Sequence, residues 1–387
     1  MISKSRIPQI RFKGFSGEWE EKKLIDEVEL FSGLTYSPND VIKNGGTLVL
    51  RSSNVKKGQI VDADNVYVNS DVVNCDNVQK GDIAIVVRNG SRSLIGKHAQ
   101  IQEEMKNTVI GAFMTGLHSK RPSYINALLD TTNFYKEIDK NLGATINQIT
   151  NGAFRQMLFS FAKPDEQTKI GNYFQNLDKL IEQKEKKYQK LKQFKKAMLD
   201  KMFPKNGADT PEVRFKGFSG EWEEKELGEL TKIKTGSSNR EDSGLDGKYT
   251  FFDRSEDIRT SDIYLFDCES IIVAGEGSDF IPKYFVGKFD LHQRTYAIMN
   301  FDNGDSKFLF YYIYLFRKWF FNQAVGSTVK SLRLPMFQEM LIKFPKKAEQ
   351  TKIGNYFQKL DKQIELQKKE LKKLKNIKKA SLDKMFV

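Results

Sequence analysis

The chain of 387 residues contains one twelve-residue segment twice, and this duplication restricts the possible folds more than any single motif. Residues 11–22 read RFKGFSGEWEEK, and residues 214–225 repeat them without a change. A second identical pair, EQTKIGNYFQ, occupies residues 166–175 and 349–358. The segments between these constant boxes differ in length and sequence. We therefore predict two related structural repeats, each with constant ends and its own variable middle.

The composition favours a protein of two or more domains with a polyanionic partner. The chain has 63 Lys and Arg against 50 Asp and Glu, a formal net charge of +13, so nucleic acid is the first candidate. With only Cys75 and Cys268, neither a disulfide framework nor a cysteine zinc site is expected. The first ten residues lack the apolar core of a secretory signal. The most apolar run, 308–321, is too short to span a membrane and contains Arg317 and Lys318, so we expect a buried helix and a cytoplasmic protein.

The closing boxes begin two long helices. Apolar residues recur there at alternating steps of three and four, which is the coiled-coil pattern. They are Ile170, Phe174, Leu177, Ile181, Tyr188, Leu191, Met198 and Met202 in the first copy, and Ile353, Phe357, Leu360, Ile364, Leu371, Leu374 and Met385 in the second. Because neither helix can bury this seam alone, we expect the two to pack antiparallel, as a pseudo-twofold relation between the repeats requires. Pro164 and Pro204 bound the first helix, which predicts a rigid spacer of roughly 57 Å at 1.5 Å per residue.

The outer faces of these helices are rich in lysine, over residues 184–196 and 368–379. Two interpretations stay open at this point. The lysines can form the solvated surface of a coiled coil, or they can contact a nucleic-acid backbone or an acidic partner.

The variable middles read as mixed α/β domains. The first has β-rich runs at 48–54, 65–68, 81–91 and 108–116, followed by a helical run at 124–142. The second has five such runs and then a helix over roughly 306–324. A weak match survives between them, since IVVRNGS at 85–91 corresponds to IVAGEGS at 272–278. The two middles should therefore share a scaffold and differ in their loops.

The chain has the same order of segments twice: an opening box, a variable domain, an exit strand with its proline, and an EQ-x-x-I helix. This order resembles that of the specificity (S) subunits of type I restriction-modification systems. The resemblance covers nearly the whole chain. It implies that each middle is a target recognition domain for one half of a split, asymmetric DNA site, and that the coiled coil sets the spacing. It also implies two methyltransferase (modification) subunits and restriction (motor-nuclease) subunits as partners. S-adenosylmethionine, ATP and Mg²⁺ are then expected only on those partners, with no cofactor on this chain.

We therefore predict an α+β protein with two mixed α/β target recognition domains, joined by two long helices that form an antiparallel coiled coil. The expected boundaries are a constant N-terminal segment at 1–24, recognition domain 1 at 25–163, a central conserved helix at 164–204, a repeated constant segment at 205–227, recognition domain 2 at 228–346 and a C-terminal conserved helix at 347–387.

The candidate DNA-binding residues are loop donors and acceptors, because Arg suits guanine and Asn or Gln suits adenine in the major groove. In the first middle they are Arg51, Ser52, Asn54, Arg88, Asn89, Ser91, Arg92 and Lys97, with Thr145, Asn147 and Gln148 from the exit segment. In the second they are Ser237, Ser238, Asn239, Arg240, Lys248, Arg254, Ser278, Arg294, Thr328, Lys330, Ser331 and Arg333. For each, a structural role remains the alternative: a loop arginine is often solvated or bound to phosphate, and Asn89-Gly90 favours a turn whatever it binds.

The aromatic residues of the opening boxes are candidate docking residues for the methyltransferase, because two identical partners need two equivalent surfaces. They are Phe12, Phe15, Trp19, Phe215, Phe218 and Trp222. The alternative is that these side chains only fix each opening segment to its own domain.

No catalytic or metal site is predicted. Glu182-x-Lys184 resembles a nuclease motif, but the second repeat has Glu365-x-Gln367 and both lie on the coiled-coil helices. A P-loop and an Asn-Pro-Pro-aromatic methyltransferase box are missing from the sequence, and the three histidines, His98, His118 and His292, have no metal-binding spacing. We interpret the chain as a non-catalytic DNA-recognition subunit. The alternatives are a scaffold with two RNA- or protein-binding domains on a coiled coil, and an intrinsic nuclease.

Overall fold

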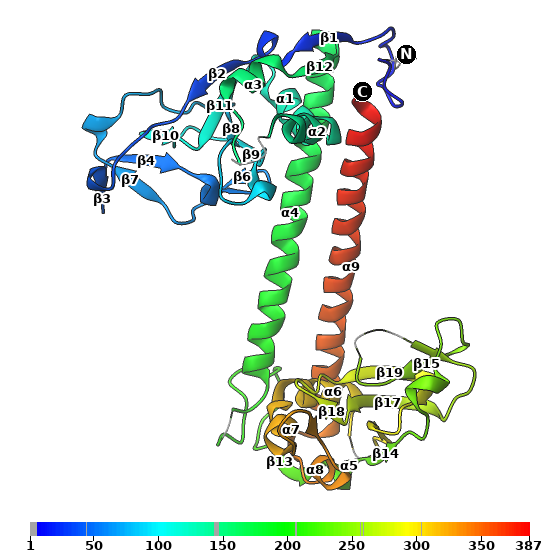
Figure 1. The fold of residues 1–387 in the computed structure, drawn as a ribbon. Helices are drawn as coiled ribbons and strands as arrows, with labels where there is room; N and C mark the ends of the chain where they lie inside the picture. The colour runs from blue at the N-terminus through cyan, green and yellow to red at the C-terminus, as the bar shows by residue number, and fades with distance from the viewer. Residues whose placement is uncertain are drawn as a thin grey trace. The chain divides into compact units, whose positions relative to one another are not determined.

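The computed structural model describes residues 6–43, 45–142, 147–205, 207–255, 257, 259–302 and 304–387. The chain divides into two compact units: unit 1 is Met1–Glu185 with Glu370–Val387, and unit 2 is Lys186–Lys369. Each unit combines one α/β domain with parts of the two long helices, α4 (Pro164–Met202) and α9 (Lys347–Met385), which have 39 residues each (Figure 1). The fold is thus α+β with an internal repeat, as predicted.

The α/β domain of unit 1 contains two four-stranded sheets, in the orders β10-β4-β7-β3 and β2-β11-β8-β9. The strands are β2 (Glu29–Ser32), β3 (Val41–Ile42), β4 (Thr47–Leu50), β7 (Val66–Val68), β8 (Ile83–Val86), β9 (His98–Gln100), β10 (Thr108–Ile110) and β11 (Met114–His118), with a small hairpin of β5 (Val55–Lys56) and β6 (Gln59–Ile60) beside them. Strand β8 is buried along its whole length and pairs antiparallel with β11 and β9. It forms the centre of the core of this unit.

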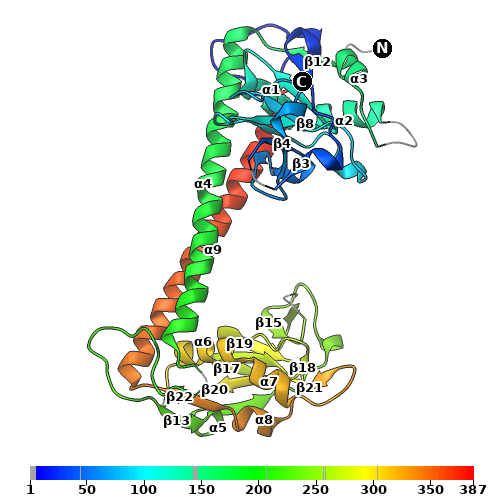
Figure 2. The ribbon, with the colours of Figure 1, turned by 90° about the vertical axis from the view of Figure 1, so that its left-hand side faces the viewer.

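The α/β domain of unit 2 contains one six-stranded sheet in the order β14-β20-β17-β19-β15-β16. The strands are β14 (Lys232–Thr235), β15 (Tyr249–Phe252), β16 (Arg259–Ser261), β17 (Phe266–Ala274), β19 (Lys283–Leu291) and β20 (Thr295–Met299). Figure 2 shows β17 between β19 and β20, and it pairs antiparallel with both. Strand β18 (Glu276–Gly277) follows β17 in the sequence and pairs with β21 (Lys330–Ser331), which carries two candidate residues.

Two helical runs predicted as single helices are each two helices. In unit 1 the run 124–142 is α1 (Pro122–Leu129) and α2 (Thr132–Asn141), because Thr131 caps α2 by accepting the Phe134 N–H at 3.2 Å. In unit 2 the run 306–324 is α6 (Ser306–Phe316) and α7 (Lys318–Gln323), followed by α8 (Leu334–Gln338). Helix α6 is largely buried, as expected.

The run 108–116, predicted as one strand, is also interrupted. Strand β10 ends at Ile110 and β11 begins at Met114, with a turn between them. The Gly111 N–H donates to the Leu50 carbonyl at 2.9 Å, and the Met114 N–H donates back to the Gly111 carbonyl at 2.8 Å. These tertiary hydrogen bonds direct the chain from one sheet of unit 1 to the other.

The constant segments pair with the exit strands in the same way in both units. In unit 1, β1 (Glu20–Lys23) lies antiparallel to β12 (Leu158–Phe161), which follows α3 (Asn151–Gln156). In unit 2, β13 (Glu223–Glu226) lies antiparallel to β22 (Leu341–Phe344) and leads into α5 (Leu227–Leu230). The registers correspond residue by residue, since Glu20 faces Phe161 and Glu223 faces Phe344.

The duplicated boxes also form the same ion pair in each unit. Arg11 binds both carboxylate oxygens of the buried Glu166 at 2.7 Å, and Arg214 binds both oxygens of Glu349 at 2.7 and 2.8 Å. A bidentate guanidinium–carboxylate pair leaves few of its charged atoms without a partner when it is buried. This pair explains why the Arg of the opening box and the Glu of the closing box are duplicated together.

The long helices pack antiparallel within each unit, as predicted. In unit 1 the Tyr173 hydroxyl lies 3.1 Å from that of Ser381, and further along α4 Lys184 pairs with Glu370 at 2.5 Å. In unit 2, Lys195 pairs with Asp361 at 2.5 Å. Residue numbers rise along α4 while those of their partners on α9 fall, which defines an antiparallel pair.

The predicted apolar seam is buried mainly near the α/β domains. Fully buried members are Ile170, Phe174, Leu177, Met202, Ile353, Phe357, Leu360, Leu371 and Met385, together with Leu199, which the heptad reading missed. The others, Ile181, Tyr188, Leu191, Met198, Ile364 and Leu374, are half-buried. The seam is thus most deeply buried where the helices join the core of each unit.

A glycine in each closing box allows close packing of a domain helix. A Cβ at Gly171 would lie 2.7 Å from the Tyr124 backbone nitrogen, and one at Gly354 would lie 2.8 Å from that of Phe308. Glycine therefore lets α1 and α6 approach the long helices. Within the described residues, no helix is both long and apolar enough to cross a membrane.

Candidate nucleic-acid interface

In unit 1 the structure brings together three of the predicted loop segments. The Asn89 side-chain amide donates to the Ser52 hydroxyl at 3.0 Å, and Lys97 Nζ donates to the Ser52 carbonyl at 3.0 Å. The Asn147 amide donates to the Gly90 carbonyl at 3.0 Å. Burial, and then the nearby Lys56, lower the pKa of Lys97 from its usual value. We name this group of loops the unit 1 site.

An exposed arginine and an exposed aromatic ring stand together at the unit 1 site. The Arg88 guanidinium lies over the ring of Phe113, 4.9 Å from its centroid. Phe113 is 55% exposed, although it follows a fully buried strand. Gln148 forms an isolated β-bridge with Arg88. The site therefore presents a cation, an apolar face and amide groups to solvent.

Other predicted residues of unit 1 support this surface. Arg51 forms an ion pair with Asp64 at 2.5 Å, while Asn54 is fully buried and its amide donates to the Ala63 carbonyl at 2.9 Å and to Asn65 at 2.7 Å. The Asn54 side chain thus holds the loop and has no exposed surface. Ser91 and Arg92 are exposed beside the site. Thr145 lies outside the described residues.

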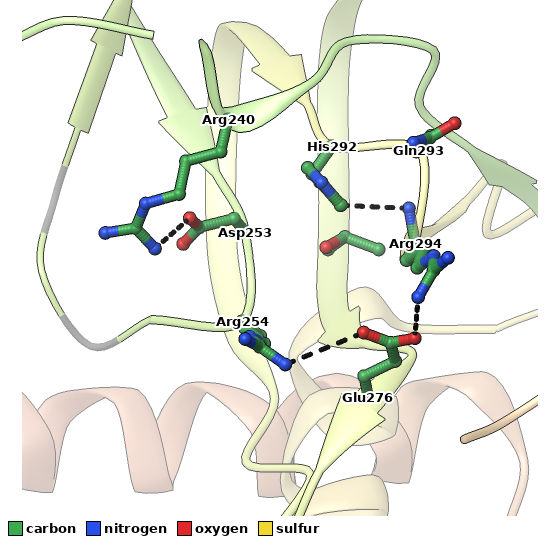
Figure 3. Close-up of a pocket in the computed structure, with 8 residues that line it drawn as sticks. Arg240, Asp253, Arg254, Glu276, His292, Gln293 and Arg294 are labelled. Atoms are coloured by element: carbon green, nitrogen blue, oxygen red, sulfur yellow. Dashed lines mark hydrogen bonds and ion pairs between the residues drawn. The ribbon is translucent and has the colours of Figure 1, made fainter. Parts of the chain in front are cut away.

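In unit 2 three of the predicted residues, Arg240, Arg254 and Arg294, line a cavity of about 320 Å³ (Figure 3). Its lining comes from the segment of Arg240 after β14, from the end of β15, from β18 and from the turn between β19 and β20. The lining residues are Arg240, Asp253, Arg254, Glu276, His292, Gln293, Arg294 and Thr295. We name it the unit 2 cavity.

Carboxylates orient the arginines of the unit 2 cavity. Glu276 forms ion pairs with Arg294 and, at 3.7 Å, with Arg254, and Asp253 pairs with Arg240 at 3.0 Å. The side chains of Arg254 and Arg294 remain 60% and 63% exposed, so their outer donors face solvent. Pairing fixes the direction of each guanidinium and leaves part of it available to a ligand.

The ionisation of this cavity follows from its neighbours. Burial acts to raise the pKa of Asp253, but hydrogen bonds from Ser255 and the charge of Arg240 outweigh it and hold the pKa below its usual value. Burial lowers the pKa of His292, against the raising effect of Asp253 and Glu276. At neutral pH the cavity therefore combines cationic donors, anionic acceptors and a neutral imidazole.

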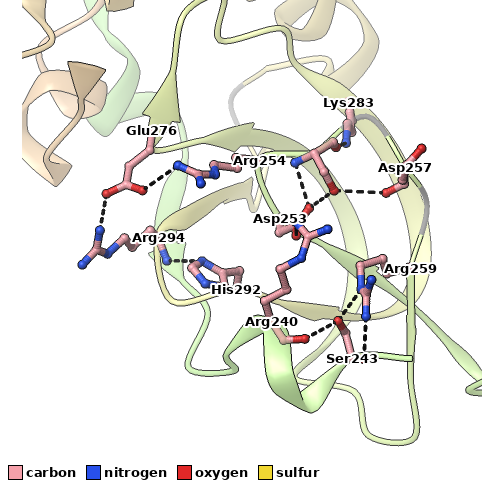
Figure 4. A network of polar contacts seen from close by, with 11 residues as sticks. Arg240, Ser243, Asp253, Arg254, Asp257, Arg259, Glu276, Lys283, His292 and Arg294 are labelled. Atoms are coloured by element: carbon pink, nitrogen blue, oxygen red, sulfur yellow. Dashed lines mark hydrogen bonds and ion pairs between the residues drawn. The ribbon is translucent and has the colours of Figure 1, made fainter. Parts of the chain in front are cut away.

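A second layer of polar contacts holds the loop of Arg240 (Figure 4). The Ser243 hydroxyl donates to the Arg240 carbonyl at 2.6 Å and accepts from Arg259 Nε at 2.6 Å. Lys283 Nζ donates to the Ser255 carbonyl at 2.8 Å, next to Asp253. Hydrogen bonds within unit 2 thus hold the walls of the cavity together.

The remaining predicted residues of unit 2 divide between the rim of the cavity and other places. Asn239 accepts from Gln293 at 2.7 Å, while Ser238 is buried and donates to Asp290 at 2.7 Å. Lys330 and Ser331 form β21, which pairs with the strand of Glu276. Those that are exposed without lining the cavity are Ser237, Lys248, Ser278, Thr328 and Arg333.

Sequence reasoning missed the acceptors of the unit 2 cavity and the exposed ring of the unit 1 site. The carboxylates Asp253 and Glu276 were not predicted because the candidates were basic, amide and hydroxyl residues, and His292 and Gln293, in the turn before β20, were not predicted either. The available signal was the pair Asp253-Arg254, an acid beside a base in one loop. Phe113 was missed because its turn was read as part of a strand.

The constant aromatic residues take two different positions. Trp19 and Trp222 are 3% and 4% exposed and pack against Phe386 and Phe203, with ring centroids 6.0 and 6.2 Å apart. Their burial favours the interpretation that the indoles fix each opening segment to its own unit. The four phenylalanines, Phe12, Phe15, Phe215 and Phe218, are half-buried and keep part of their surface accessible.

The histidines take part in local polar contacts. His118 Nδ1 lies 2.9 Å from Asp82, and His98 Nε2 lies 3.3 Å from Asp130. Among the described residues, no group of three or more His, Cys, Asp or Glu side chains is placed to hold a metal ion.

Two α/β domains with different polar sites, each joined to the same constant segments, define an internally duplicated protein with two different candidate binding sites. The chain belongs to the type I restriction modification DNA specificity domain family, whose model matches residues 16–193 and again residues 219–376. The family match therefore covers both repeats.

Individual relatives agree with this assignment. The specificity subunit of the type I restriction enzyme EcoDI from Escherichia coli is 32% identical over 157 residues, which is 41% of this chain and 35% of that protein. The chain thus aligns with about a third of the length of this curated relative. The crystal structure of the type I restriction-modification S subunit from M. genitalium has the same fold, with a TM-score of 0.71, 16% identity and 98% and 99% of the two chains covered. A chain from a structure on complex assembly and conformational transition of the type I R-M system gives a TM-score of 0.50 at 15% identity, with 95% and 97% covered.

Proposed function

We propose that this chain is the DNA-recognition subunit of a type I restriction-modification complex. The observation that carries the proposal is the pairing of two unlike polar sites with two identical frameworks. The unit 1 site offers amides, a cation and an aromatic face, whereas the unit 2 cavity offers arginines alternating with carboxylates. Different donor and acceptor patterns select different base pairs in the major groove.

The target of such a protein is split and asymmetric. Each unit reads one half, and the two halves differ because the two sites differ. Helix α4 is continuous from Pro164 to Met202, so it acts as a rigid spacer, and the number of unread base pairs between the halves is fixed. The net charge of +13 favours contacts with phosphates and makes the affinity fall as salt rises.

Two methyltransferase subunits dock on the constant framework in this proposal, because that framework is the part present twice. The half-buried phenylalanines are the candidate contacts. Lys169 lies over the ring of Phe15 at 5.1 Å, and Lys352 lies over Phe215 and Phe218 at 5.1 and 5.4 Å. Restriction subunits join the same complex, and S-adenosylmethionine, ATP and Mg²⁺ belong to the partners.

The proposal is tested by expressing the chain with its methyltransferase and mapping methylated DNA across the host genome. One split sequence with a constant gap is the expected result. The purified complex should bind duplex DNA with that sequence, lose affinity steeply with salt, and resist competition by a scrambled duplex. Equal binding to scrambled DNA, or preference for RNA, would support the alternative of a scaffold with two other binding domains.

A further inference from the structure

One turn occupies the same place in both units. In unit 1 it is the turn 111–113 between β10 and β11, and in unit 2 it is the turn 292–294 between β19 and β20. Each joins two strands that are consecutive in the sequence, beside a polar site. We call them the paired turns.

The same backbone hydrogen bonds hold the paired turns. In unit 1 the N–H groups of Gly111, Ala112 and Met114 donate to the carbonyls of Leu50, Leu34 and Gly111, at 2.9, 2.9 and 2.8 Å. In unit 2 the N–H groups of His292, Gln293 and Thr295 donate to those of Phe252, Ser238 and His292, each at 2.9 Å. The match extends to the third residue of each turn. Phe113 accepts from the Val87 N–H at 3.0 Å, and Arg294 accepts from the Gly275 N–H at 2.8 Å.

Phe113 and Arg294 are therefore equivalent positions on a rigid support. The residue Phe113 is 55% exposed and the side chain of Arg294 is 63% exposed, while their backbones are fixed by the strands around them. A functional side chain is best held on such a support, because its position is then set before the ligand arrives. The two residues differ completely in chemistry.

The surroundings of Arg294 suit a base edge and not a phosphate. Glu276 and Asp253 place two carboxylates beside the three arginines of the cavity, and carboxylate oxygens next to the guanidinium groups disfavour a phosphodiester, which offers only acceptors. A base edge carries both donors and acceptors, so a cavity that alternates arginines with carboxylates can match it. Glu276 also orients Arg294, which leaves the outer donors of the fork for a pair of acceptors.

The surroundings of Phe113 suit a ligand that presents an apolar group between polar groups. Its ring is covered on one side by Arg88 and is otherwise largely exposed, next to the amides of the unit 1 site. The thymine methyl is the apolar group that a base pair presents in the major groove.

We propose that the paired turns read bases, with Arg294 contacting the N7 and O6 atoms of a guanine and Phe113 contacting the methyl group of a thymine. This inference rests on the proposed function and assigns the reading chemistry of each half. The same turn thus reads a different base in each unit because a different side chain stands at its third position.

The test replaces single atoms of the DNA. Once the target has been mapped, duplexes are made in which one guanine at a time is 7-deazaguanine, which lacks N7, or one thymine at a time is uracil, which lacks the methyl. Affinities are measured for the complex of the full chain with its methyltransferase. One deazaguanine should weaken binding about tenfold, as one lost charged hydrogen bond does. One uracil in the other half should weaken it about fourfold, from the loss of one buried methyl.

Each variant serves as the control for the other. The Arg294→Ala complex should bind the sensitive deazaguanine duplex as tightly as the unmodified duplex, and should still bind the sensitive uracil duplex more weakly. The Phe113→Ala complex should bind the uracil duplex as tightly as the unmodified duplex, and should still bind the deazaguanine duplex more weakly. If a split target is found but neither substitution changes the loss of affinity caused by any replaced DNA atom, the paired turns do not read bases and the proposed function stands. If no split target exists, the proposed function fails, and this inference with it.

Discussion

A single lysine links three elements of unit 1. Lys378 on α9 contacts Asp178 on α4 at 2.6 Å and Asp130, between α1 and α2, at 2.7 Å. His98 lies 3.3 Å from the same Asp130 carboxylate. The equivalent lysine of unit 2, Lys195, has one carboxylate, Asp361, which accepts the Tyr311 hydroxyl at 2.6 Å.

The half-buried Asp130 makes the stability of unit 1 depend on pH. Burial acts to raise its pKa, but His98 and Lys378 outweigh this and bring the pKa to about 2, from 3.8. A depressed carboxyl pKa stabilises the folded state above the unfolded value, and this stabilisation is lost as pH falls towards the folded value. The expected loss is at most about 2 kcal/mol, because the pKa of Asp178 is raised by burial and acts in the opposite direction.

The measurement is the free energy of unfolding of the wild type and of Asp130→Asn between about pH 5 and pH 2. The wild type should lose more stability than the variant over this range, and the two curves should converge at the acid end. Parallel curves would show that Asp130 does not titrate with folding.

The two buried Arg–Glu pairs provide matched variants. Glu166→Gln and Glu349→Gln each leave a half-buried arginine without its charged partner, so each should destabilise its own unit by about 3 kcal/mol. Hydrogen exchange should locate the first loss in unit 1 and the second in unit 2. Equal loss of protection in both units from one variant would contradict the separate roles of the two pairs.

At the scale of elements, the sequence pattern was enough to predict the long helices but not the loops. Seven-residue periodicity and the flanking prolines predicted α4 and α9, because a buried helix face repeats along the sequence. The turn at Gly111 could not be predicted, since its apolar run looks continuous and its hydrogen bonds go to Leu50 and Leu34, far away in the chain. For the same reason Phe113 was missing from the candidate site, whereas Arg294, at the start of the predicted β-rich run 294–301, was included as a basic loop residue.

The helix seam is tested by one substitution on each long helix. Leu177 and Leu360 are 9% and 7% exposed, so Leu177→Asp and Leu360→Asp each bury a charge and should cost about 3 kcal/mol in the free energy of unfolding. Leu180→Asp is the matched control, because Leu180 is 39% exposed on the same helix and should change stability by less than about 1 kcal/mol. Similar melting temperatures for all three variants would mean that the seam is misassigned.

For the whole molecule, the repeat separates what is constant from what varies. Identical boxes form identical ion pairs, strand pairs and tryptophan contacts in the two units. The sites between them have different residues on equivalent turns. This arrangement lets the reading chemistry of one unit change without changing the framework that supports it, which is the basis of the proposed two-part target.

The most direct test of this account exchanges residues 25–142 for the corresponding middle of a related family member and maps the methylated target again. The account predicts that one half of the target changes while the other half and the gap between them stay the same. A change in both halves, or a target that is continuous or palindromic, would contradict it.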